Sequence, residues 1–136
     1  MDITIHFSRF EPDHVDVAPR ETVRFVVHNT DPIDHEFILG DQYVQTIHEN
    51  GTELRHPPKP GEMSVPAGTT QVTTYTFPAT NGQLIFACHL PGHYAFGTVG
   101  RATGRIGGSP HPPPPVGPTP GLDRTTNVTD DDGTRR

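Results

Sequence analysis

The chain has 136 residues with a single cysteine and nine histidines, and its formal net charge is -6. One cysteine excludes an internal disulfide and any zinc site or iron–sulfur cluster that needs two thiolates from one chain. The acidic balance and the single lysine argue against nucleic-acid binding, which requires basic clusters that neutralise phosphates. No apolar run approaches the roughly 18 residues of a membrane span, and no apolar signal-peptide segment follows Met1.

Valine, isoleucine and threonine total 36 residues, whereas leucine and alanine total only 11. Beta-branched side chains pack well on a pleated sheet, and the scarce residues are strong helix formers, so we expect a mostly β protein. Alternating or continuous apolar residues predict strands near residues 3–7, 15–17, 22–28, 36–39, 63–65, 70–77 and 84–88, with a last strand within 94–106. In the first strand, Ile3, Ile5 and Phe7 share the apolar face. Turn signals every 8–12 residues predict a Greek-key β-sandwich.

One helix is expected, over residues 41–51. Asp41 can cap its N-terminus, Gly51 can stop it, and its apolar residues Tyr43, Val44 and Ile47 share one face. Beside it lie four possible metal ligands within nine residues, namely His48, Glu49, Glu53 and His56. A second metal site is conceivable there, but a polar helix end and loop is the preferred interpretation.

The composition changes near Ile106. Residues 107–121 contain seven of the chain's sixteen prolines, which favours solvated polyproline II conformation, and residues 122–136 are polar. We therefore expect one domain over residues 1–106 and a disordered Pro/Gly-rich and polar tail over residues 107–136, serving as a spacer.

The cysteine lies at the end of an apolar strand, and a histidine follows five residues later. Between Cys88 and His93, the Pro91-Gly92 pair predicts a tight turn that lets the two side chains reach the same point. His35, at the start of another apolar run, can face the same end of a sandwich. His89 should point to the opposite face. One thiolate and two imidazoles suit copper. A buried, inert thiol and a Cys88/His93 nucleophile–base pair are the alternatives, although no oxyanion-hole glycine turn and helix accompany Cys88.

The segments N-T-D-x-x-x-H-E-F (residues 29–37) and C-H-x-P-G-H-Y (residues 88–94) resemble those of the cupredoxins, the plastocyanin/azurin type of blue copper protein, and in particular small bacterial cupredoxin-like domains. The resemblance covers residues 2–106. It implies an eight-stranded sandwich that holds one type 1 copper ion, cycling between Cu(I) and Cu(II), with His35, Cys88 and His93 as ligands. It implies a one-electron carrier and not an enzyme. A copper-binding or delivery module with the same fold is the alternative function.

The resemblance fails at the axial ligand. The family's weak axial methionine usually falls five residues after the second histidine, where this chain has Thr98. Thr98 therefore takes the axial position without a thioether, and a water, a carbonyl, its own hydroxyl or no donor could serve there. Met63, the only internal methionine, is interpreted as an ordinary strand residue, with a substitute axial donor as the lesser alternative.

The expected partners are redox proteins that dock near His93. The apolar residues around this histidine, Leu90, Pro91, Tyr94 and Phe96, would form the docking patch, although one of the two aromatic residues is expected in the core. The resemblance implies a monomer that works outside the cytoplasm, in the periplasm or at the cell exterior.

Overall fold

The computed structural model describes residues 1–51, 57–80 and 82–104, and these residues form nine strands and one helix. The elements are β1 (Asp2–His6), β2 (Arg9–Glu11), β3 (His14–Val17), β4 (Thr22–Asn29), β5 (His35–Gly40), α1 (Gln42–Glu49), β6 (Glu62–Val65), β7 (Thr70–Thr76), β8 (Gln83–Ala87) and β9 (Val99–Gly104). The predicted all-β sandwich with one short helix is confirmed. The proposed tail, residues 107–136, lies outside the described residues.

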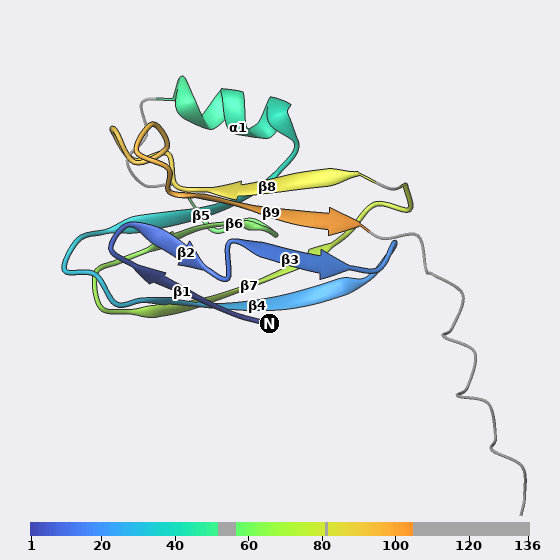
Figure 1. The fold of residues 1–136 in the computed structure, drawn as a ribbon, viewed down its shortest axis with the longest axis horizontal. Helices are drawn as coiled ribbons and strands as arrows, with labels where there is room; N and C mark the ends of the chain where they lie inside the picture. Colours follow the sequence, from blue (N-terminus) through green and yellow to red (C-terminus); the bar gives the residue numbers. More distant parts are fainter. Residues whose placement is uncertain (52–56, 81, 105–136) are drawn as a thin grey trace, which may run out of the picture.

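The strands form two sheets that pack face to face (Figure 1). One sheet has the order β2-β1-β4-β7 and the other the order β3-β9-β8-β5-β6. Most neighbours are antiparallel, but β1 runs parallel to β4 and β3 runs parallel to β9. Because β2 and β3 follow each other in sequence yet lie in different sheets, the N-terminal segment joins the two layers.

Four phenylalanines link the layers at the centre of the core. Phe10 and Phe25 come from the first sheet, and Phe37 and Phe86 come from the second. Their ring centroids lie between 5.2 and 6.0 Å apart in four pairs, in tilted, stacked and edge arrangements that favour aromatic packing. Phe37 lies two residues after His35 and Phe86 lies two residues before Cys88. One strand that anchors the core, β5, therefore begins at a predicted ligand, and another, β8, ends directly before one.

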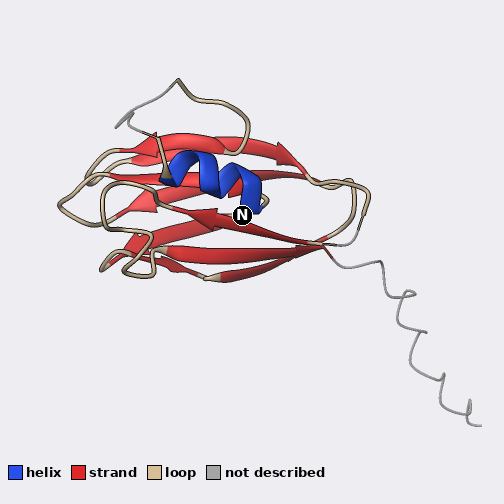
Figure 2. Ribbon diagram, turned by 90° about the horizontal axis from the view of Figure 1, so that it is seen from above, coloured by secondary structure: helices blue, strands red, loops and turns tan. Residues whose placement is uncertain are grey.

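Strand β5 is buried on both faces, because α1 covers the outer face of its sheet (Figures 1 and 2). The predicted cap is confirmed: the Asp41 carboxylate accepts a hydrogen bond from the Val44 N–H at 3.0 Å. The apolar side chains of Tyr43 and Ile47, however, are exposed. The fully buried residue of α1 is Gln45, whose amide nitrogen donates to the carbonyls of Ile38 and Ile85. Polar docking onto strand carbonyls thus holds this helix in place.

The first predicted strand is one residue too long. Phe7 does not continue the apolar face of Ile3 and Ile5, because the chain reverses at residues 7 and 8 and leaves the Phe7 side chain 80% exposed. This turn, the loop from β4 to β5 and the loop from β8 to β9 gather at one end of the sandwich (Figure 1). In the described part of the chain, no helix is long and apolar enough to cross a membrane.

Candidate metal centre

Cys88 is fixed in a buried position directly after β8. Its N–H donates to the Thr98 carbonyl at 3.1 Å, which closes the base of the loop between β8 and β9. Its Sγ atom accepts a hydrogen bond from the Glu36 N–H at 3.3 Å, across the sheet on β5. The thiol is fully buried. Both neighbouring strands therefore define where the sulfur lies.

His93 reaches the cysteine through a tight turn. The His93 N–H donates to the Leu90 carbonyl at 2.9 Å, with Pro91 and Gly92 at the two central positions. Gly92 has φ of 86°, which a type II turn requires at its third residue and which glycine adopts without a steric penalty. The turn brings Nδ1 of His93 to 3.2 Å from Sγ of Cys88. The predicted Cys–Pro-Gly–His geometry is present.

His35 completes the group from the start of β5. Its ring is buried and lies 4.8 Å from the ring of His93, centroid to centroid. Nε2 of His35 lies 2.8 Å from Oδ2 of Asp31, whereas its buried Nδ1 has no hydrogen-bond partner. One ligand atom from each of His35, Cys88 and His93 lies within 4.8 Å of the other two.

These three side chains fit a metal ion by their chemistry. An unpartnered buried imidazole nitrogen costs free energy unless something binds it, and the ring that carries it lies in one group with a thiol and a second imidazole. A soft thiolate with two imidazoles is a donor set that suits copper. Burial raises the pKa of the Cys88 thiol to about 11 in the metal-free protein, so a metal ion must displace its proton. Burial and the nearby His35 lower the pKa of His93, which keeps that ring neutral and able to bind.

Thr98 is buried beside this group, but its hydroxyl is committed elsewhere. Thr98 Oγ1 donates to the Ser8 carbonyl at 2.7 Å, and its N–H donates to the His93 carbonyl at 3.1 Å. The residue therefore ties the β8–β9 loop to the β1–β2 turn. Its axial role stays a prediction. Met63 lies in β6, within the hydrophobic core, as expected of an ordinary strand residue.

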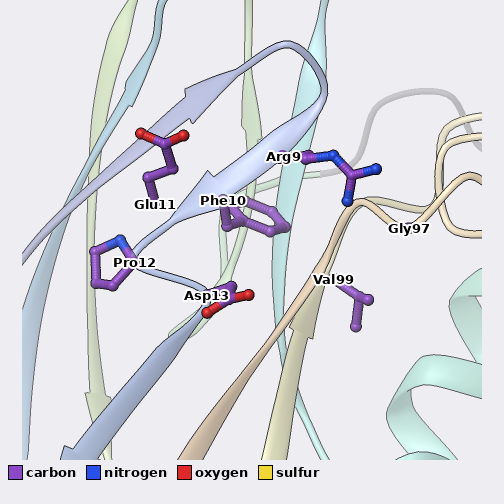
Figure 3. A pocket seen from close by; sticks show the side chains of 7 residues that line it. All are labelled: Arg9, Phe10, Glu11, Pro12, Asp13, Gly97 and Val99. Atoms are coloured by element: carbon purple, nitrogen blue, oxygen red, sulfur yellow. The ribbon is translucent and has the colours of Figure 1, made fainter.

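A pocket of about 300 Å³ is lined by Gly97 and Val99, the two sequence neighbours of Thr98 (Figure 3). Gly97 and Val99 form one wall, and the opposite wall comes from the segment that begins at Arg9 and ends at Asp13. Its rim carries both signs of charge, and none of the three clustered ligands lines it. The pocket thus lies beside the candidate centre and does not open onto its donor atoms.

One expectation about the surroundings is corrected. Neither Tyr94 nor Phe96 belongs to the core, because residues 91–97 form successive turns in place of a strand. Phe96 is 81% exposed, and Tyr94 stacks on His89 at 4.7 Å between ring centroids. His89 does point away from the group, as predicted, with Nε2 at 2.6 Å from the side-chain oxygen of Gln45.

The second metal site near α1 is not supported. Among the described residues, a group of three metal-ligating side chains forms only at His35, Cys88 and His93. The ring of His48 is engaged by the Val44 carbonyl and by the Glu62 carboxylate. Glu53 and His56 lie outside the described residues.

Sequence reasoning missed Asp31 and Asn29. Both are buried, and both lie in the same N-T-D segment that carries the resemblance. Asp31 contacts His35, and Asn29 anchors the loop between them through its side-chain bonds to Ile33 and Val65. Hydrogen bonds from Ser8, His35 and Phe7 outweigh the effect of burial and lower the pKa of the Asp31 carboxyl, so that it is ionised. The sequence signal that could have indicated this contact is an aspartate four residues before a candidate histidine ligand.

The two-sheet sandwich, with this group at its loop end, has a cupredoxin-like fold. Two solved structures share the fold. Auracyanin from Roseiflexus castenholzii has a TM-score of 0.63 at 20% identity over 76% of this chain and 94% of its own. Auracyanin A, a blue copper protein from Chloroflexus aurantiacus, has a TM-score of 0.61 at 20% identity over 77% and 97% of the two chains. No family model matches the chain.

Two sequence relatives are copper-resistant cuproproteins named CopI. The protein from Rubrivivax gelatinosus is 36% identical over 102 residues, which is 71% of this chain and 60% of the relative. The protein from Pseudomonas aeruginosa is 29% identical over 136 aligned positions, which is 76% of this chain and 74% of the relative. The chain thus spans about three fifths of the first of these proteins.

Proposed function

We propose that the chain holds one copper ion through Cys88, His35 and His93, and that this ion carries single electrons between redox partners. The proposal is carried by the unpartnered Nδ1 of the buried His35, whose ring lies with Cys88 and His93 in one group of candidate ligands within 4.8 Å of one another. The resemblance to blue copper proteins in fold and the copper-resistant relatives support it. A thiolate and two imidazoles accommodate both oxidation states of copper.

The residues that contact Cys88 and His35 hold these two ligands in fixed positions. Cys88 is held by backbone bonds from β5 and to Thr98, and His35 is held by Asp31, so neither ligand needs to move when an electron arrives. Burial of Cys88 and His35 excludes water from two of the three ligand side chains. A site that changes little between oxidation states exchanges electrons with little reorganisation. We propose on these grounds that the domain is an electron carrier and not an enzyme.

An apolar rim at the same end offers a docking surface for a redox partner. Phe96 and Phe7 are 81% and 80% exposed, and Ile33 is 45% exposed in the loop before His35. Small, fairly apolar contacts are typical of transient electron-transfer complexes. The variant Phe96→Ala should slow electron exchange with a partner, whereas Val72→Ala, at an exposed position of β7, should not. We also propose that the protein works outside the cytoplasm.

The copper-resistant relatives favour a second function, in which the same site binds copper in order to sequester or deliver it. Voltammetry and electron self-exchange measurements on the copper-loaded protein separate the two. A reversible one-electron couple with fast self-exchange supports the carrier. Irreversible cycling, together with rapid loss of copper to a chelator, contradicts the carrier and supports delivery.

A further inference from the structure

Asp31 is a buried carboxylate that contacts a candidate metal ligand from behind. It is 6% exposed, and its Oδ2 lies 2.8 Å from Nε2 of His35. An ionised carboxylate can only accept a hydrogen bond, so the proton must lie on Nε2. The neutral His35 ring then keeps its lone pair on Nδ1. That is the atom without a protein partner, and a nitrogen of this ring lies within 4.8 Å of the candidate ligand atoms of Cys88 and His93.

The carboxylate is itself held by a strained turn. The N–H groups of Phe7 and Ser8 donate to Oδ1 and Oδ2 of Asp31 at 2.7 and 2.8 Å. Both residues have left-handed backbone conformations, with φ of 48° and 55°, as the two-residue turn between β1 and β2 requires. This conformation is costly for residues other than glycine. The hydrogen bonds to one negative charge offset that cost and immobilise the carboxylate.

The backbone of Asp31 is fixed as well. Its N–H donates to the side-chain oxygen of Asn29 at 3.0 Å, and the amide nitrogen of Asn29 donates to the Val65 carbonyl at 2.9 Å. The β1–β2 turn therefore holds the Asp31 carboxylate, while Asn29, which is anchored to the end of β6, holds the Asp31 backbone. These contacts hold the Asp31 carboxylate in place against Nε2 of His35.

We propose that Asp31 is a positioning residue that sets the tautomer and orientation of His35 and raises the basicity of its Nδ1 toward a bound metal. A carboxylate behind a ligating histidine increases electron donation to the metal, and its removal typically lowers metal affinity by about 10- to 100-fold. Because Cu(II) gains more from donation than Cu(I), the Asp31 carboxylate stabilises the oxidised state. This role rests on the proposed copper function.

The test compares Asp31→Asn with Asp2→Asn. Asp2 makes a matched control because its Oδ1 lies 3.0 Å from Nε2 of His28, an exposed pair at the far end of β1. Each variant removes one negative charge and one carboxylate–histidine contact. Asp31→Asn should lower the affinity for Cu(II) by about 10- to 100-fold and raise the reduction potential. Asp2→Asn should change neither. Equal affinity and potential in the two variants would overturn the proposal.

Nitrogen-15 NMR of the metal-free protein gives a readout that does not depend on copper. His35 should be a single Nε2-protonated tautomer in the wild type and a mixture in Asp31→Asn, because an amide can donate as well as accept. An Nδ1-protonated His35 in the wild type overturns the proposal even if the variant does not fold. If instead the tautomer is as expected and Cu(II) gives no thiolate band, the copper function fails while the positioning role of Asp31 stands.

Discussion

The hydroxyl of Thr98 donates a hydrogen bond to the carbonyl of Ser8 at 2.7 Å. The N–H of Ser8, in turn, donates to the carboxylate of Asp31, which contacts His35. One residue of the β1–β2 turn thus connects the position of the expected axial ligand with the histidine on the other side of the group. The N-terminal hairpin is part of the site, although it contributes none of the proposed ligands.

The variant Thr98→Met tests the axial position. A thioether at residue 98 would add a weak donor, which stabilises Cu(II) and lowers the reduction potential. The variant also leaves the half-buried Ser8 carbonyl without its donor, at a cost of about 1 kcal/mol in unfolding free energy. Voltammetry, the ratio of the visible bands and thermal unfolding measure these effects.

The control for this change is Thr98→Val, which keeps the shape and removes the hydroxyl. It should show the loss of stability without a change in the visible spectrum, because the hydroxyl is committed to Ser8. A large spectral change in Thr98→Val would mean that the hydroxyl contacts the metal. An unchanged potential in Thr98→Met would mean that residue 98 does not face it.

The metal-free protein should lose stability in alkali through Cys88. Burial raises the pKa of this thiol from an ordinary 9.0 to about 11, so the folded state holds its proton more tightly than the unfolded chain does. Its contribution is fully present below about pH 9 and is lost as the pH rises toward 11. The shift corresponds to about 2–3 kcal/mol. Unfolding by denaturant between these pH values measures it.

The comparison is with Cys88→Ala. This variant lacks the thiol but keeps the other groups that titrate in alkali, namely the tyrosines and the lysine. The unfolding free energy of the wild type should fall more steeply with pH than that of the variant. Parallel curves would show that the thiol has an ordinary pKa and is not desolvated as the fold requires.

Gly100→Ala should destabilise the sandwich next to the centre. A Cβ atom at this position would collide with the ring of Phe86 and lie 2.9 Å from the Asp13 carbonyl. Overpacking of this kind typically costs about 1–3 kcal/mol. Gly82→Ala should be close to neutral, because no atom of the described residues, its chain neighbours aside, lies within 4 Å of the added carbon. Chemical denaturation of both variants checks the difference, and equal stabilities would contradict the tight packing of β9 against Phe86.

The sequence was sufficient for the fold class and for the cluster of Cys88, His35 and His93. Strand alternation, the Pro-Gly turn and the spacing of the histidines are local signals, and the structure brings these residues together. The contacts of Asp31 could not be predicted in this way. They depend on a turn whose residues, Phe7 and Ser8, lack the Asn-Gly signature of their backbone conformation. The alternation of apolar residues alone therefore predicted a first strand that continued through Phe7, whereas β1 ends at His6.

The helix shows a similar limit. Its cap at Asp41 is a local pattern and was predictable, but its docking through Gln45 depends on free carbonyls of β5 and β8 that only the assembled sheet presents. An apolar stripe of Tyr43, Val44 and Ile47 suggested a buried face, whereas Tyr43 and Ile47 face solvent. Hydrophobic periodicity does not predict polar contacts between segments that are distant in the sequence.

The most direct measurement is a titration of the metal-free protein with Cu(II), followed by visible absorption and electron paramagnetic resonance. The wild type should develop an intense thiolate-to-copper band at one equivalent, and Cys88→Ala should lose it, because the sulfur is the electron donor of that transition. His35→Ala and His93→Ala should lose or strongly alter the band. His89→Ala should keep it, because the ring of His89 contacts Gln45. Binding of Cu(II) to the wild type without this band would contradict a type 1 copper centre at Cys88.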